Sequence, residues 1–218
     1  VDSEKGLKDL IVSCESFNCI GLSFEVDTEH FMDAKVVGIG LSFEPGHGVY
    51  IPLSHVEIEQ KSNSKQLDAF FVFNQLKPVL ENDLVLKAGH DLKNMDHVFE
   101  NHGVNLTPLK ADIMVASYVY DSVSSKHRLF DIARDRLGLE MTDFESLLGK
   151  GRNKKTVSQV APVDVMKVSA EKADFSLRSW LFLNQLLSES GILHDVFRYF
   201  EQPLIQVLKD IEKSGISV

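Results

Sequence analysis

Residues 19–53 read CIGLSFEVDTEHFMDAKVVGIGLSFEPGHGVYIPL, and they contain three apolar segments rich in β-forming residues. The segments are residues 19–27, 35–43 and 48–53, and the last of them follows the turn signal Glu44-Pro45-Gly46. Short strands joined by tight connections are typical of an antiparallel meander. The sequence therefore predicts three consecutive strands near the start of the chain.

Helical periodicity surrounds these strands. Apolar residues recur at helical spacing in residues 3–14, 65–80, 91–102, 112–120, 127–137, 162–188 and 195–214. Residues 84–88 form one more short apolar strand, and Gly103 is expected to end the helix at 91–102 as a C-terminal cap. Three strands followed by helices that alternate with one or two further strands predict an α/β domain around a mixed sheet.

The composition is that of a globular protein. Of 218 residues, 44 % are hydrophobic and 25 % are charged, which is enough apolar material for a core without disulfide or metal support. Cys14 and Cys19 lack zinc-site spacing and are expected to be reduced thiols. We find no signal peptide or membrane-spanning run. The missing initial Met and the abrupt end at Val218 indicate a fragment of a longer protein.

The net charge argues against one class of nucleic-acid-binding protein and is compatible with another. A formal net charge of -9 is unusual for a dedicated nucleic-acid coat protein, which would be basic. It is compatible with a nuclease, because a two-metal site is itself built from carboxylates.

Asp27 and Glu29 are the most informative residues for chemistry. They lie two apart at the end of a predicted strand, so their side chains are expected to project from the same face. Paired carboxylates are the ligands that Mg²⁺ prefers, and two metals about 4 Å apart can clamp a phosphodiester during hydrolysis. By itself this pattern also fits two solvated acids at a strand end.

Six further segments give the pair its context. In sequence order they are GLSF (40–43), YIP (50–52), LKPVL (76–80), KAGHDLK (87–93), GKG (149–151) and AEKAD (170–174). With Asp27-Thr28-Glu29, their order and spacing resemble the 3′–5′ exonuclease (proofreading) domain of bacterial DNA polymerase I, of family A. Residues 200–216 resemble the start of that family's polymerase thumb. The resemblance thus implies an exonuclease-like domain at 1–192 and the beginning of a polymerase domain at 193–218.

The resemblance implies an RNase H-like (DnaQ-like exonuclease) fold, with a mixed five-stranded sheet flanked by helices. Active members use four carboxylates, two metals and a tyrosine that positions the attacking water. Asp27 and Glu29 match the first two acids. Met95 stands where the third acid is expected, Val168 where the tyrosine is expected, and Lys172 where the fourth acid is expected. The loop at 30–35 is also shorter than in the family, which puts the grip on a primer end in doubt.

Two nearby acids, Asp96 and Asp174, could replace the missing ones. A shift of one residue turns a side chain by about 100° on a helix, and Met95, not Asp96, falls on the apolar stripe. Asp174 lies about 200° from Lys172 and should face away. The remaining site has a formal charge of about -1, and an amine close to the acids repels cations. We therefore expect no bound metal, and we expect Lys172 to form a salt bridge with Asp27 or Glu29.

These expectations lead to a vestigial, catalytically inactive 3′–5′ exonuclease domain, kept as a structural module that packs on the polymerase domain. The alternatives are a weak exonuclease that uses Mg²⁺ or Mn²⁺ with a repositioned acid, or an inactive module that binds single-stranded nucleic acid. By resemblance, the parent chain is a DNA-directed DNA polymerase, a nucleotidyltransferase of DNA replication and repair. It would reach DNA through its full length in the bacterial cytoplasm, near the nucleoid, and the fragment is expected to be a monomer without membrane contact.

The other candidate residues fit structural roles better. The eight histidines lack metal-ligand spacing and are read as surface or hydrogen-bonding residues. The basic residues Lys150, Arg152, Lys154 and Lys155 could contact phosphates, but a solvated loop is favoured. Phe70, Phe71 and Phe73 could stack on bases, but helical spacing favours core packing, as it does for Trp180.

Overall fold

The computed structural model describes residues 1–28, 30–56, 66–149, 151 and 154–215, which build a five-stranded sheet in the order β3-β2-β1-β4-β5. β1 (Cys19–Val26), β2 (Val36–Glu44) and β3 (His47–Pro52) pair antiparallel. β4 (Leu86–Gly89) lies parallel to β1, and β5 (Ala111–Asp112) lies parallel to β4. The predicted meander and mixed sheet are therefore confirmed.

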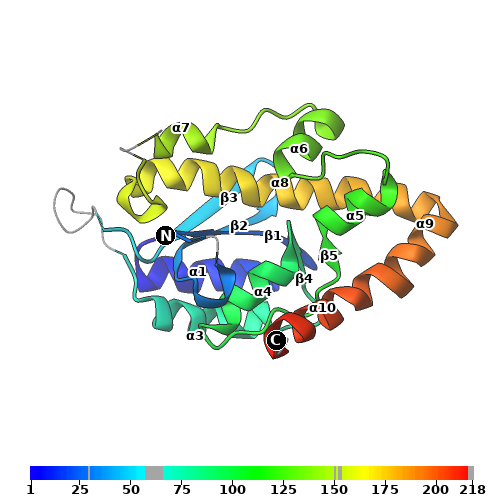
Figure 1. The fold of residues 1–218 in the computed structure, drawn as a ribbon. Coiled ribbons are helices and arrows are strands. Elements are labelled where there is room, and N and C mark those ends of the chain that lie inside the picture. The colour runs from blue at the N-terminus through cyan, green and yellow to red at the C-terminus, as the bar shows by residue number, and fades with distance from the viewer. Residues whose placement is uncertain (29, 57–65, 150, 152–153, 216–218) are drawn as a thin grey trace.

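Helices cover both faces of the sheet (Figure 1). α1 (Glu4–Glu15), α3 (Ala69–Leu80) and α4 (Leu92–Glu100) share one apolar core with the strands. α8 (Pro162–Glu189) lies across the other face, where α5 (Ile113–Tyr120) and α6 (Leu129–Leu137) surround it. The described elements thus form three layers, as an α/β fold requires.

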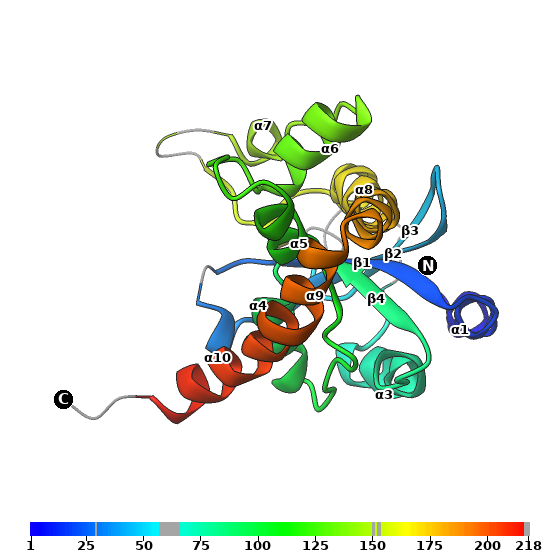
Figure 2. The ribbon, with the colours of Figure 1, turned by 90° about the vertical axis from the view of Figure 1, so that its right-hand side faces the viewer.

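Shorter elements connect and extend these layers. They are the 3₁₀ turns η1 (Phe31–Asp33) and η3 (Val157–Gln159), the helices α7 (Phe144–Leu148), α9 (Gly191–Val196) and α10 (Gln202–Ser214), and the π-helical turn η4 (Phe197–Glu201). The single helix predicted at 195–214 is wrong in detail, because the π-helical turn divides it. Figure 2 shows α9 and α10 running from the end of α8 past α5 towards α4.

Three glycines let α8 lie directly on the strands. A Cβ atom at Gly21 would come within 2.1 Å of the Ala173 carbonyl oxygen, and one at Gly40 within 2.5 Å of the Ser169 carbonyl oxygen. Gly48 makes the same close approach to Ala170. The three glycines belong to β1, β2 and β3, so the close contact runs across the meander. This close contact between the glycines and α8 fixes which residues of α8 face the end of β1.

Of the four aromatic residues predicted to pack in the core, three do so and one does not. Trp180 is 4 % exposed and Phe73 is fully buried, as expected. Phe71 packs against the core, but Phe70 is 72 % exposed. α3 begins later than predicted because Asp68 caps it, accepting a hydrogen bond from the Phe71 N–H at 2.8 Å. Phe70, on the first turn after this cap, faces away from the sheet.

The cysteines and the basic loop also have defined surroundings. Both Cys14 and Cys19 are free, and burial raises the pKa of Cys14 to about 12 and that of Cys19 to about 11. Lys154 pairs with Glu145 at 3.4 Å, while Lys150 and Arg152 lie outside the described residues. Across the described part of the chain, no helix is long and apolar enough to cross a membrane.

His55 gives the fold a defined response to acid. It is 2 % exposed, its Nε2 lies 2.8 Å from the Tyr50 hydroxyl oxygen and its Nδ1 lies 3.1 Å from the Val160 carbonyl oxygen. A neutral ring with hydrogen on Nδ1 satisfies both contacts, since Nε2 then accepts from Tyr50. Burial lowers the pKa of His55, so the folded state binds its proton less readily than the unfolded state does.

Because the folded pKa is lowered, the stability that neutral His55 contributes is present above about pH 6.5 and is lost as the pH falls through the folded pKa. We expect urea unfolding at pH 7.5 and at 5.5 to show a shallower pH dependence for His55→Gln than for the wild type. The difference cannot exceed one proton's slope, about 1.4 kcal/mol per pH unit. The exposed His47, replaced by Gln, is the matched control; equal slopes in all three proteins would contradict the assignment.

Candidate active site

The end of β1 carries a buried ion pair. Glu25 is 3 % exposed, and both of its carboxylate oxygens lie 2.9 Å from the Lys172 ammonium nitrogen on α8. The pairing with β2 shifts by one residue at this point, because Glu25 pairs with Gly38 and Val26 with Val36, which leaves Val37 of β2 as the extra residue. The Lys172 ammonium also lies 4.3 Å from the centre of the Phe144 ring.

We expected Lys172 to pair with Asp27 or Glu29, and its described carboxylate partner is Glu25. Asp27 instead accepts two hydrogen bonds from Ser158, one at 2.8 Å from its backbone N–H and one from its hydroxyl. Glu29 lies outside the described residues. Glu25 was missed by sequence reasoning, although Glu25-Val26-Asp27 has the same spacing of two as Asp27-Thr28-Glu29. Among the described acids at the end of β1, the one that contacts α8 is therefore Glu25, while Asp27 contacts η3.

The two apolar positions contribute no metal ligand of the expected kind. Met95 on α4 is 1 % exposed and Val168 on α8 is fully buried. α4 begins where Asp91 caps it, with φ at 60° and the side chain accepting from the Asn94 N–H. Met95 fills the space beside Gly89, where a Cβ atom would meet its Cε at 3.0 Å.

The acids that could have replaced the missing ligands point elsewhere. Asp96 is 2 % exposed, accepts a hydrogen bond from the Leu106 N–H at 2.7 Å and forms an ion pair with Lys209 on α10. Asp174 binds the Gly46 N–H at 2.7 Å, in the turn between β2 and β3. Both sequence arguments, for Met95 over Asp96 and for an Asp174 that faces away, agree with these contacts.

A small cavity remains between β1, α4 and α8. Its volume is about 190 Å³, and its described lining residues are Leu22, Ser23, Phe24, His90, Met95, Leu129, Lys172 and Ser176. None of these residues carries a carboxylate, and the buried Ser176 hydroxyl has no hydrogen-bond partner among the described residues. His90 is held by the His127 carbonyl oxygen at 2.7 Å from its Nε2. The cavity is lined by apolar groups, hydroxyls and one amine.

These residues do not fit a pair of divalent metals. Glu25 is saturated by Lys172, and both oxygens of Asp27 are bound to Ser158. Within the described residues, no three or more His, Cys, Asp or Glu side chains gather where they could hold an ion. Hard divalent cations need several oxygen ligands, and a neighbouring ammonium opposes their charge. The described geometry can hold an ion pair but offers no two-metal site.

Comparison of this chain with a family model and with curated relatives gives matches that agree with each other. A family model described as a 3′–5′ exonuclease matches residues 1–186. DNA polymerase I of Pseudomonas aeruginosa is 31 % identical over 217 residues, covering 99 % of this chain and 23 % of the relative. DNA polymerase I of Chloroflexus aurantiacus is 26 % identical over 212 residues, covering 96 % and 22 %. The chain thus spans about a quarter of the length of these relatives.

Solved structures share the fold at low sequence identity. The polymerase Pol1 from M. smegmatis, in complex with DNA primer-template and dNTP, superimposes with a TM-score of 0.73 at 18 % identity, covering 99 % of this chain and 32 % of that one. Escherichia coli RNase D, an exoribonuclease, gives 0.69 at 16 % identity over 97 % of this chain and 50 % of its own. Brucella melitensis NrnC bound to pGG gives 0.64 at 14 % identity, with 93 % and 89 % covered. These neighbours support the RNase H-like fold predicted from the sequence.

Proposed function

The chain belongs to the 3′–5′ exonuclease family and resembles that domain of bacterial DNA polymerase I, and from this premise we propose that it no longer hydrolyses nucleic acid and acts as a structural module of a DNA polymerase. In this proposal the polymerase activity belongs to the rest of a longer chain. The domain supplies a folded body against which the following domain packs. No metal cofactor takes part.

The ion pair between Lys172 and Glu25 carries the proposal. An ammonium group 2.9 Å from both oxygens of the strand-end acid occupies the contacts that a cation would need. At about 4 Å and an effective dielectric constant near 20, two unit charges interact by about 4 kcal/mol, and a divalent ion would be repelled about twice as strongly by Lys172. Met95 and Val168 add no charge to compensate. The site therefore favours its own lysine over a metal.

The preserved core supports a structural role. Met95 and Val168 are as well buried as their apolar neighbours, so both positions belong to the packed interior, and only a cavity of about 190 Å³ lies beside Met95. Buried polar contacts remain in place between β1 and α8, including the Ser23 hydroxyl that donates to the Ser169 carbonyl oxygen at 2.8 Å. A domain that has an intact fold but lacks acids at expected metal-ligand positions fits a structural role, in which only the packing of the domain is needed.

A nuclease assay tests the proposal. The chain is incubated with a 5′-labelled single-stranded oligonucleotide and an excess of Mn²⁺ or Mg²⁺, and the products are separated by length. We expect no shortening above the level without protein. Glu25→Gln is the matched variant, because it removes the remaining buried acid at the site without adding a charge. Shortened products that form with the wild type and disappear with Glu25→Gln would overturn the proposal in favour of a weak exonuclease.

A further inference from the structure

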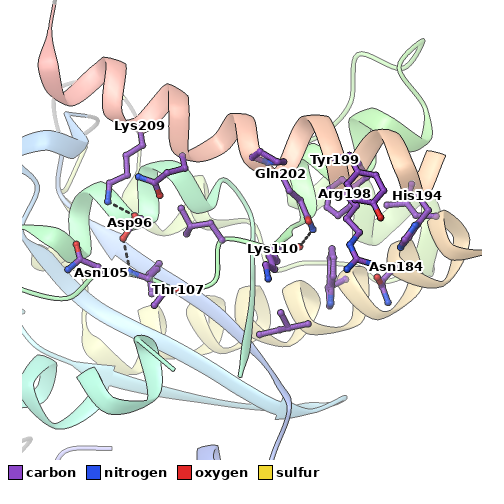
Figure 3. Close-up of a pocket in the computed structure, with 18 residues that line it drawn as sticks. Asp96, Asn105, Thr107, Lys110, Asn184, His194, Arg198, Tyr199, Gln202 and Lys209 are labelled. Carbon is purple, nitrogen blue, oxygen red and sulfur yellow. Dashed lines mark hydrogen bonds and ion pairs between the residues drawn. The ribbon is translucent and has the colours of Figure 1, made fainter. Parts of the chain in front are cut away.

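A second and larger cavity lies away from the candidate active site. It is a groove of about 660 Å³ between segment 105–110, the last turns of α8, the π-helical turn η4 and the start of α10 (Figure 3). It shares no described lining residue with the cavity at Met95 and Lys172. Sites for small organic ligands typically occupy about 300–1,000 Å³. The groove has the size of such a site.

The charge of the groove is opposite to that of the chain. Three cationic side chains line it, Lys110, Arg198 and Lys209, together with one acid, Asp96, so its formal charge is +2 with His194 neutral, in a chain of -9. Lys209 is neutralised by Asp96, whereas no ion pair to a described carboxylate involves Lys110 or Arg198. Two exposed, unpaired cations beside a cavity attract an anion.

The π-helical turn supplies one of the two exposed cations that line the groove. It carries Arg198 and also Phe197, whose ring lies 5.9 Å from that of the buried Trp180. Gln202 donates from its side-chain amide to the Lys110 carbonyl oxygen at 2.6 Å, which ties α10 to the segment that bears Lys110. π-helical insertions occur often at functional sites because they redirect side chains from a regular helix. Figure 3 shows Lys110, Gln202 and Arg198 along the same groove.

The remaining lining matches a planar polar group more than a simple ion. Trp180, Phe197 and Leu109 form an apolar floor, and the exposed amide of Asn184 beside Arg198 can pair with a donor or an acceptor. A phosphate ion alone would fill only a small part of the groove. The described groups fit an anion that carries a flat ring with a hydrogen-bonding edge.

We propose that this groove binds a nucleoside phosphate, with its phosphate between Lys110 and Arg198 and its base against the floor near Asn184. Charge-assisted hydrogen bonds from the two cations supply most of the affinity. The site is independent of the ion pair at Glu25. A free nucleotide and the terminal nucleotide of a DNA strand present the same chemistry, so the experiment separates these two sources.

Trp180 is the only tryptophan of the chain, so its fluorescence reports on this groove. We expect dTMP to change the emission with saturation, while inorganic phosphate at the same concentrations does not saturate. Lys110→Gln and Arg198→Gln should each weaken dTMP binding by about tenfold or more, the effect of losing one charge-assisted hydrogen bond.

A second titration distinguishes a nucleic-acid strand from a free nucleotide. A 5′-phosphorylated (dT)8 strand that binds at least about tenfold more tightly than dTMP, with a steep salt dependence, would identify a strand as the natural ligand. Equal affinities would identify a free nucleotide.

Lys8→Gln is the control, because Lys8 is exposed on α1, which lies on the far side of the molecule from α9 and α10 (Figure 2). It should leave the affinity unchanged, and urea unfolding should show that all variants are folded. The proposal is overturned if dTMP gives no saturable change at millimolar concentrations. It is also overturned if the double variant of Lys110 and Arg198 binds as the wild type does, or if Lys8→Gln weakens binding equally.

Discussion

Lys209→Met is expected to lower the free energy of unfolding by about 3–5 kcal/mol, the cost of breaking a buried ion pair from one side. Lys209 is 4 % exposed and Asp96 is 2 % exposed, and the ammonium contacts the carboxylate directly. The other oxygen of Asp96 accepts from the Leu106 N–H, so the carboxylate cannot turn to water when its partner is removed. The variant would leave an uncompensated buried charge.

Lys213→Met is the matched control for this prediction. It lies one turn further along α10 and pairs with Glu100 of α4 at 2.5 Å, but its side chain is 57 % exposed. Because such exposed ion pairs contribute little to stability, the free energy of unfolding measured in urea should change little. The double variant Asp96→Leu/Lys209→Met should recover much of the loss, because apolar side chains can replace a buried pair. Equal small effects of Lys209→Met and Lys213→Met would show that burial does not decide the strength of this contact.

The same contacts bear on the predicted division at residues 192 and 193. α10 is joined to α4 through Lys209, through Lys213 and through Glu212, which lies 2.5 Å from Lys93 and 3.0 Å from His97. Figure 2 shows α10 alongside α4. A segment expected to begin a polymerase domain thus shares a buried charge pair with the exonuclease-like body. If Lys209→Met destabilises the whole chain in one transition, α10 is an energetic part of that body.

The sheet and its helices could be predicted because their periodicity is strong over many residues. β1, β2 and β3 were found within one or two residues of their ends, as was α8. β5 was missed because two residues, Ala111 and Asp112, carry no alternation to detect. The π-helical turn was missed for another reason: its apolar residues keep a helical spacing, so only the backbone reveals the extra residue in the turn.

The residues of the candidate site could be named from the sequence, but the partner of Lys172 could not. Resemblance singled out Met95, Val168 and Lys172, and the first two are buried, on α4 and α8. The partner of Lys172 depends on which acids face α8, and residues 25, 27 and 29 all share one face of an ideal strand. β1 ends at Val26, so the alternation of an ideal strand does not continue to Asp27.

Introducing acids at two positions is expected to create a metal site. The variant Met95→Asp/Lys172→Asp removes the ammonium that binds Glu25 and places two carboxylates at the cavity that Met95 and Lys172 line. With Glu25 these acids carry a formal charge of about -3 and offer the oxygen ligands that a hard divalent cation needs, whereas Glu25 and Lys172 together sum to about zero. Without metal, the new carboxylates crowd a buried site and should lower the melting temperature.

Mn²⁺ should then restore stability to the double variant alone. A ligand at one hundred times its dissociation constant stabilises the folded state by about 2.7 kcal/mol, which raises the melting temperature by several degrees. The single variant Met95→Asp keeps Lys172 beside Glu25 and should respond much less, because the amine still competes for that carboxylate. Thermal unfolding with EDTA and with Mn²⁺ compares the three proteins directly. A comparable Mn²⁺ response of the wild type would mean that Lys172 does not keep cations from Glu25, and the account of the lost site would fail.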